Sequence, residues 1–200
     1  MPKTSGSKLR KVEQLVLVST SPRRREILAG FVPKLKVIPP KCAERPVRSP
    51  TDLRANSVAK LKSVKLPSVS LALAADTAVF LDSKVMGKPL NVAAARRMLR
   101  ELSGKWHAVY TAMAVSIDSS IEVATARAEV RFRKLSEAII EAYVSTGEPL
   151  DKAGAYGIQG LGGLLVEEIR GDYYNVVGLP IQRLEEMLEA RGYTLLLARI

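Results

Sequence analysis

Short apolar runs alternate with amphipathic stretches along the chain, as strands and helices do in an α/β protein. The apolar run 15–18, bounded by polar residues, predicts a buried strand. After it, Ser21 suits a helix N-cap, Pro22 suits the first helical position and Gly30 suits the helix end. The pattern therefore predicts a strand, a tight turn and a helix at about 22–30.

The same patterns predict the remaining strands and helices. Strands are expected at 35–38, 71–75, 79–81 with Val85, 106–117, 121–132, 164–169 and 193–198. Helices are expected at 49–65, 92–102, 136–145 and 180–191, with turns at 118–120 and 171–175 and irregular segments at 39–52 and 148–163. Strands alternating with helices, plus one long antiparallel pair, predict a single α/β domain with a mixed, elongated sheet flanked by helices.

Composition adds an unusual charge to an otherwise ordinary globular chain. Hydrophobic residues make up 47% of the 200, which is enough for a real core. The formal net charge of +11 indicates an anionic partner, such as nucleic acid, an acidic membrane or a polyanionic small molecule. Aromatic residues are only 5% and no nucleic-acid-binding signature is present, which argues against nucleic acid.

The ends and the single cysteine bear on compartment and domain organisation. Residues 1–13 are rich in Lys, Ser and Gly and are predicted to form a flexible basic tail before a domain at 14–200. The first apolar run is too short for a signal peptide or a membrane span. Cys42 cannot form an internal disulfide, which fits a reducing compartment. We therefore expect a cytoplasmic protein that does not bind membranes.

Three consecutive arginines, Arg23, Arg24 and Arg25, occupy the first turn of the first predicted helix. Cations beside the positive end of a helix dipole cost about 0.3–1 kcal/mol each. An anion bound there would reverse that cost, because backbone N–H groups and guanidinium groups would converge on its oxygens. The pattern predicts a phosphate-binding turn, and the alternative is a solvated basic helix start.

Two more residues suggest polyanion chemistry. Asp76 follows a buried run, so it is expected at the carboxyl end of a strand, where it could hold a divalent cation or accept a proton from water. Its alternative role is a capping or turn aspartate. Lys88 lies between Gly87 and Pro89 on a stiff turn and could contact a phosphate, or it could be a surface lysine.

The glycine-rich stretch 151–160 is the second unusual feature, because such loops usually serve function. Gln159 within it carries a donor and an acceptor on one amide, as reading a base edge requires. The stretch matches neither a Walker A loop nor a dinucleotide-binding fingerprint. With one cysteine and one histidine, His107, any metal chemistry should use carboxylates and suit magnesium or manganese, and His107 is expected to be structural.

Several motifs in one order resemble the Maf family of nucleoside triphosphate pyrophosphatases over about residues 15–190. They are Leu17–Leu28, Ala75-Asp76-Thr77, Gly87-Lys88-Pro89, Leu102-Ser103-Gly104, Asp151–Gly160 and Asn175–Pro180. The resemblance implies a fold related to inosine-triphosphate pyrophosphatase with a deep central cleft, often as a homodimer. It also implies hydrolysis between the α and β phosphates of a nucleoside triphosphate with a divalent metal such as magnesium, manganese or cobalt.

Residue by residue, the resemblance implies these roles. Asp76 would be the proton acceptor or a metal-linked carboxylate, with Glu44 helping to hold the metal. Phosphate contacts would come from Ser19, Arg24, Lys60 and the catalytic Lys88. Arg23, Thr77 and Gln159 would set substrate choice, and this triplet resembles the dTTP/UTP branch rather than the 7-methyl-GTP branch. Modified pyrimidine nucleotides remain open as substrates.

Two departures from the family pattern leave alternatives open. The segment between Glu44 and Lys60 is a few residues shorter than is usual, and Asn56-Ser57 replaces Leu-Ala. Lys62 is therefore an alternative to Lys60 as the phosphate-contacting lysine. The alternative function is a basic nucleic-acid-binding or cell-division regulatory protein without turnover.

Overall fold

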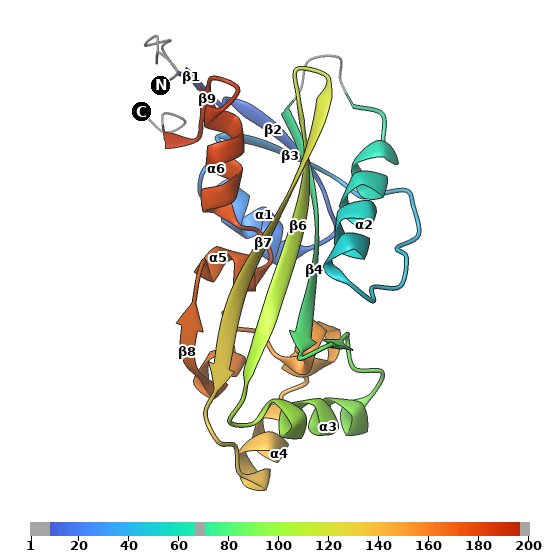
Figure 1. Ribbon diagram of the computed structural model, residues 1–200, viewed down its shortest axis with the longest axis vertical. Coiled ribbons are helices and arrows are strands. Elements are labelled where there is room, and N and C mark those ends of the chain that lie inside the picture. The colour runs from blue at the N-terminus through green and yellow to red at the C-terminus, as the bar shows by residue number, and fades with distance from the viewer. Residues whose placement is uncertain (1–8, 67–70, 197–200) are drawn as a thin grey trace.

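The computed structural model describes residues 9–66 and 71–196 of the chain, which fold around a twisted seven-stranded sheet (Figure 1). The strand order is β3-β2-β4-β6-β7-β8, and β5 pairs with β4. The strands are β2 (Gln14–Val18), β3 (Lys34–Ile38), β4 (Leu71–Leu81), β5 (Lys84–Met86), β6 (Trp106–Ile117), β7 (Ser120–Phe132) and β8 (Val166–Arg170). β2 is parallel to β3 and β4, whereas β4, β6, β7 and β8 form an antiparallel series. The predicted mixed, elongated sheet is confirmed.

Within residues 9–66 and 71–196, six α-helices flank this sheet. They are α1 (Pro22–Ala29), α2 (Pro50–Lys62), α3 (Val92–Leu102), α4 (Glu137–Ser145), α5 (Tyr173–Val177) and α6 (Ile181–Glu189). Between α4 and β8 lie three short 3₁₀ helices, η1 (Glu148–Asp151), η2 (Ala153–Ala155) and η3 (Leu161–Leu165). Polar caps define the starts predicted from sequence: the Ser21 Oγ accepts the Arg24 N–H, and the Asn91 Oδ1 accepts the Ala94 N–H.

Alternate residues of β4 face opposite sides of the sheet and so divide the core. Ala72, Ala74, Ala78 and Phe80 pack on the α2 side, with Leu53 and Leu61 of that helix. On the other side, Leu71, Leu73 and Ala75 pack near α1 and α6, whereas Val79 and Leu81 pack near α3 and α4. By the same alternation, Asp76 lies on the α2 side and Thr77 on the opposite side.

One edge of β4 lacks a strand partner in its middle, as far as the described residues show. β2 pairs with β4 only at Leu71–Leu73, and β5 pairs with it only from Val79 onward. The carbonyl of Ala75, in this gap, accepts hydrogen bonds from Arg24 Nη1 at 2.9 Å and Lys60 Nζ at 3.3 Å. Side chains therefore take the place of a strand here, and the gap leaves room for a site.

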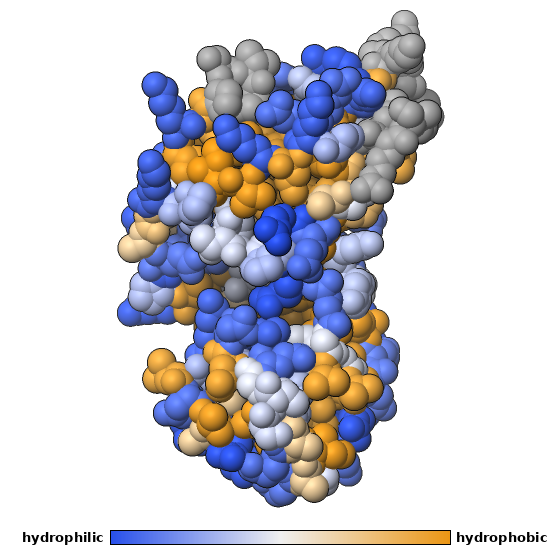
Figure 2. Space-filling view, turned by 180° about the vertical axis from the view of Figure 1, so that it is seen from behind, coloured by the Kyte–Doolittle hydropathy of each residue, from blue (hydrophilic) through white to orange (hydrophobic). Residues whose placement is uncertain are grey.

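Seen from behind, hydrophilic residues form a band across the middle of the surface, between two areas richer in apolar residues (Figure 2). This band matches the division of the core into clusters at the two ends of the long strands (Figure 1). Within the described ranges, no helix is both long and apolar enough to cross a lipid bilayer.

Three local predictions differ from the structure. Asp76 was expected at the carboxyl end of a strand, which is wrong: β4 runs unbroken from Leu71 to Leu81, because its pairing with β6 continues through Asp76. The segment 171–175 was expected to be a turn, but Tyr173–Val177 forms α5, begun by Asp172, whose Oδ1 accepts the Tyr174 N–H. The stretch 148–163 is not without regular structure, since it contains the short 3₁₀ helices.

The predicted flexible tail, residues 1–13, is described only from residue 9. Arg10–Lys11 forms β1 and pairs in parallel with β9 (Tyr193–Thr194), the short strand predicted within 193–198. Val12 is 1% exposed and belongs to the core near α1 and α6. The last part of the predicted tail is thus packed against the domain, and residues 1–8 and 197–200 lie outside the described residues.

Candidate active site

A cavity of about 330 Å³ lies beside the unpaired edge of β4, a volume within the range of small-molecule sites. The turn into α1, helix α2, strand β4, the turn after β5 and the segment around η2 contribute to its walls. All nine predicted site residues line it: Ser19, Arg23, Arg24, Glu44, Lys60, Asp76, Thr77, Lys88 and Gln159. The structure thus brings the predicted residues together, whereas their individual roles stay predictions.

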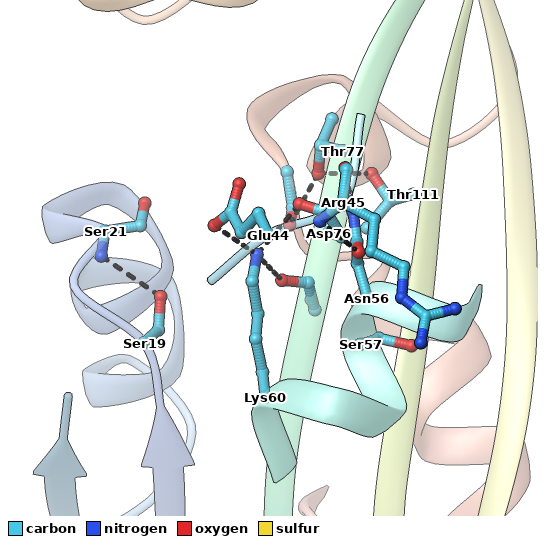
Figure 3. Close-up of polar contacts among 12 residues, drawn as sticks. Ser19, Ser21, Glu44, Arg45, Asn56, Ser57, Lys60, Asp76, Thr77 and Thr111 are labelled. Carbon is cyan, nitrogen blue, oxygen red and sulfur yellow. Dashed lines mark hydrogen bonds and ion pairs between the residues drawn. The ribbon is translucent and has the colours of Figure 1, made fainter. Parts of the chain in front are cut away.

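Asp76 is the centre of a buried polar cluster on the α2 side of β4 (Figure 3). Its Oδ1 accepts a hydrogen bond from Lys60 Nζ at 2.8 Å, and its Oδ2 accepts one from Asn56 Nδ2 at 2.9 Å. Asn56 and Lys60 are four residues apart on α2, so one face of the helix presents both donors to the strand. The carboxylate is held in one orientation from two sides.

Glu44 approaches the same lysine from the segment before α2. Its Oε1 lies 2.8 Å from Lys60 Nζ, so one ammonium contacts two carboxylates. The Lys60 side chain is 5% exposed and that of Glu44 is 60% exposed, which places the lysine inside and the glutamate at the rim. Lys62, in contrast, is exposed and does not line the cavity. Of the two lysines, Lys60 lines the cavity, and its role as the phosphate-contacting lysine stays a prediction.

The carboxylate pair suits a divalent cation only together with other ligands. Within the described ranges, no group of three or more His, Cys, Asp or Glu residues could hold a metal by itself. Magnesium, however, is usually held by one or two carboxylates together with water and substrate phosphate oxygens. Asp76 and Glu44 converge on the single cation of Lys60, so their oxygens already face one positive group. The donor set fits a metal that arrives with a phosphate ligand.

Asn56 is a site residue that the sequence reasoning did not assign a role. It is 2% exposed, and its Nδ2 also donates to the carbonyl of Arg45 at 3.0 Å, while its Oδ1 accepts the Arg45 N–H at 3.0 Å. One amide thereby joins Asp76 to the backbone next to Glu44. Its position four residues before Lys60, together with its departure from the family pattern, was the only signal in the sequence.

Arg24 ties the first turn of α1 to the sheet. Its Nε donates to the Gly178 carbonyl and its Nη1 to the Ala75 carbonyl, each at 2.9 Å, and its Nη2 donates to Thr77 Oγ1 at 2.9 Å. Burial lowers the pKa of the guanidinium, and the nearby carboxylate of Asp76 opposes that effect. Three of its N–H groups are therefore used within the protein, and the two that remain can face the cavity.

Thr77 also belongs to a buried network on the side of β4 away from α2. Its hydroxyl lies 2.9 Å from the Thr111 hydroxyl, which donates to the Asn175 carbonyl at 3.2 Å.

Ser19 acts locally, because its Oγ accepts the Ser21 N–H at 3.0 Å and so shapes the turn into α1 (Figure 3). Both Thr77 and Ser19 line the cavity while supporting its walls.

The other three predicted residues leave their polar groups available. Arg23, Lys88 and Gln159 line the cavity, and their side chains make no hydrogen bond or ion pair with another residue in the part of the chain that the structure describes. Around the cavity, basic side chains outnumber acidic ones by five to three: Arg23, Arg24, Lys60, Lys88 and Lys152 against Glu44, Asp76 and Asp151. This excess suits an anionic ligand.

His107 does not line this cavity, although its partner Tyr156 does. It is 3% exposed, contacts the rings of Phe132 and Tyr156 edge-on, and its Nε2 lies 2.9 Å from the Tyr156 hydroxyl. This environment fits a structural residue, and the role itself stays a prediction.

Comparisons with known proteins point to one family. The family described as Maf-like protein matches residues 14–191. A protein of Dictyoglomus thermophilum named dTTP/UTP pyrophosphatase is 43% identical over 191 residues, covering 92% of this chain and 99% of that protein. A protein of the same name from Moorella thermoacetica is 48% identical, covering 90% of this chain and 96% of that protein. Another from Thermococcus kodakarensis is 45% identical, covering 88% of this chain and 95% of that protein.

Proposed function

The chain belongs to the Maf family, and we propose that it is a nucleoside triphosphate pyrophosphatase that acts on dTTP and UTP. Water attacks the α-phosphorus, the bond from that phosphorus to the α–β bridging oxygen breaks, and the products are a nucleoside monophosphate and pyrophosphate. The proposal takes its substrates from the names of the three relatives described above.

The single observation that carries the proposal is the buried carboxylate of Asp76 beside a basic turn. Asp76 is 7% exposed, yet it lines the cavity together with the arginines of α1. Lys60 and Asn56 hold its two oxygens, so it can accept a proton from water without reorienting. A carboxylate fixed in this way fits general-base chemistry on a polyanion better than a turn aspartate would.

The cations around the cavity would offset the charge of a triphosphate, about four negative charges at neutral pH. Arg23 and Lys88 make no side-chain hydrogen bond or ion pair among the described residues, so both can meet phosphate oxygens directly, although the charge of Arg23 also acts on Asp151. Arg24 and Ser19 shape the turn and offer further donors. Electrostatic stabilisation of this kind is usually the largest catalytic term, and one donor contributes roughly 3–4 kcal/mol.

A divalent cation, magnesium, manganese or cobalt, would be held by Asp76 and Glu44 with phosphate oxygens of the substrate. When bound, it would lower the pKa of water and polarise the phosphate. The protein side chains bind and orient: Lys60 keeps the two carboxylates on one point, and Asn56 fixes the backbone beside Glu44.

Base choice would fall to Gln159, with Arg23 and Thr77 beside it. The amide of Gln159 can pair with O4 and N3–H of uracil or thymine. Its loop reaches the cavity from the segment after η2. Homodimer formation and a cytoplasmic location, both expected from the sequence, are part of this proposal, and light scattering would test the first.

The test is pyrophosphate release from dTTP, UTP, CTP, purine nucleotides and modified pyrimidine nucleotides, each with magnesium, manganese or cobalt. We expect dTTP and UTP to be cleaved best. Asp76→Asn should lower kcat by at least about a hundredfold while circular dichroism stays unchanged. Absence of turnover on every nucleotide, together with salt-dependent DNA binding, would favour the alternative of a nucleic-acid-binding protein.

A further inference from the structure

The carboxylate of Glu148 lies inside the loop that carries Gln159. Glu148 Oε2 accepts the N–H of Leu161 at 2.9 Å, and Oε1 accepts the N–H of Gly162 at 3.1 Å. Oε1 also accepts the hydroxyl hydrogen of Tyr143 at 2.9 Å. Three donors, two of them from the loop backbone, therefore converge on one carboxylate that does not line the cavity.

Tyr143 completes this attachment from helix α4. It is 5% exposed, and its hydroxyl accepts the N–H of Gly157 at 3.1 Å while donating to Glu148. The backbone is thus held on both sides of Gln159, at residue 157 before it and at residues 161–162 after it. We call Glu148 and Tyr143 the loop clamp.

The loop can approach the clamp closely because two of its residues lack side chains. A Cβ atom at Gly160 would overlap the Glu148 carboxylate, and one at Gly162 would lie 2.6 Å from the Tyr143 hydroxyl. Both approaches are closer than real Cβ contacts allow. Glycine at these two positions therefore lets the loop backbone lie directly against the Glu148 carboxylate and the Tyr143 hydroxyl.

The clamp holds only the backbone of the loop, at residues 157, 161 and 162, and not the Gln159 side chain. Gln159 is exposed and its amide has no hydrogen-bond partner in the described ranges. A free amide can rotate and then satisfy the base pattern of cytosine as well as that of uracil. The position of its Cα, fixed by the backbone on both sides, is what limits its reach.

Burial and hydrogen bonding act in opposite directions on Glu148. Burial alone would raise the pKa of its carboxyl, but the two backbone N–H groups, the Tyr143 hydroxyl and the charge of Lys152 together outweigh it, and the pKa is lowered. The group is therefore ionised at neutral pH and accepts charge-assisted hydrogen bonds.

We propose that Glu148 and Tyr143 are positioning residues for base selection: by holding residues 157 and 161–162, they present Gln159 to the base and set the preference for UTP over CTP. This inference rests on the proposed function, since it needs turnover of pyrimidine triphosphates. It does not place either residue in contact with the substrate. Neither side chain would take part in the attack on the α-phosphorus.

The experiment compares wild type, Glu148→Ala, Glu148→Gln and Tyr143→Phe, with Glu141→Gln as the matched control. Glu141 is an exposed glutamate of α4 that pairs with Arg96 and contacts no part of the loop. For each protein, kcat and KM are measured on UTP and on CTP. Hydrogen exchange at the amides of Leu161 and Gly162 reports on the clamp without any need for activity.

Glu148→Ala should lower the UTP/CTP ratio of kcat/KM by about fivefold or more, because a mobile Gln159 accepts both bases. The loss should come from weaker discrimination in KM, with kcat on UTP changed less than about threefold. Glu148→Gln, which keeps an acceptor oxygen, should recover part of the ratio, and Glu141→Gln should match wild type. Hydrogen exchange at the amides of Leu161 and Gly162 should be fastest in Glu148→Ala. It should be slower in Glu148→Gln and should match wild type in Glu141→Gln.

Two results would overturn the inference. In one, Glu148→Ala loses amide protection but keeps the wild-type ratio. In the other, all activities fall in parallel on UTP and CTP, as general destabilisation would cause. If wild type itself releases no pyrophosphate from any nucleotide, the proposed function is wrong, and the inference is wrong with it. The wild-type measurement identifies this case before any variant is compared.

Discussion

Arg24 and Thr77, 53 positions apart in the chain, are joined by a 2.9 Å hydrogen bond from Nη2 to Oγ1. The bond fastens the first turn of α1 to the stretch of β4 that has β6 on one edge and no strand partner on the other edge within the described residues. The Arg24 guanidinium, which was predicted to hold phosphate, therefore also stabilises the fold through its hydrogen bonds. Its substitution should affect stability as well as catalysis.

Arg24→Ala should lower the free energy of unfolding by about 1–3 kcal/mol, because the Ala75 and Gly178 carbonyls lose a donor in a buried place. It should also raise KM for UTP through the altered turn. Urea unfolding and steady-state kinetics measure the two effects. Arg25→Ala is the control: Arg25 is exposed on the same turn and does not line the cavity, so both quantities should stay near wild type.

Lys60 and Lys62 offer a matched pair two residues apart on α2. Lys60→Met should lower kcat/KM by at least about a hundredfold, since it leaves Asp76 with one buried oxygen unpaired and Glu44 without its cation. Lys62→Met, at an exposed position, should stay within about twofold of wild type. Pyrophosphate release decides between them, and equal losses in both variants would contradict the assignment of Lys60.

The sequence was sufficient for most of the elements and for a set of residues that line one cavity, because both depend on local signals. Caps, prolines and glycines mark the helix ends, and the motifs that resemble the family bring their residues to one cavity. The position of Asp76 could not be predicted in the same way. An Asp-Thr pair after an apolar run is typical of a strand end, but pairing with β6 continues the strand, and side chains of α2 satisfy the carboxylate.

The supporting contacts were equally beyond the reach of local patterns. Asn56 and Glu148 have ordinary local surroundings in the sequence, and each gains its role from a segment that folding brings to it: Arg45 and Asp76 for the first, residues 161–162 for the second. Arg24 shows the reverse case, because its charge pattern predicted a ligand contact and the structure adds contacts within the protein. Partners distant in the chain decide such roles.

His107 should make stability depend on pH. Burial lowers the pKa of the imidazole from 6.5 to about 4, so between these values the unfolded chain binds a proton that the folded chain does not. Above about pH 6.5 this group does not lower the free energy of unfolding. As the pH falls toward 4, the free energy of unfolding decreases by at most about 3 kcal/mol.

Urea unfolding at pH values from 7.5 to about 4.5 would measure this slope. His107→Gln, which can keep a hydrogen bond to the Tyr156 hydroxyl, should flatten it in that window. A variant with the full wild-type slope would assign the effect to other groups.

Base selection should depend on the amide of Gln159. Uracil and thymine present an acceptor at O4 and a donor at N3, and cytosine presents the reverse. The amide matches one pattern in one orientation and the other pattern after rotation, so discrimination requires that the cavity with its bound nucleotide hold one orientation. Leaving buried polar groups unpaired then costs roughly 1–3 kcal/mol, about ten- to a hundredfold in kcat/KM. Wild type should therefore prefer dTTP and UTP over CTP, and Gln159→Ala should lose most of that preference while retaining turnover, because the carboxylate of Asp76 and its partners lie on another wall of the cavity. Competition assays with UTP and CTP in one reaction measure the ratio directly, and an unchanged ratio in Gln159→Ala would transfer base recognition to Arg23 or Thr77.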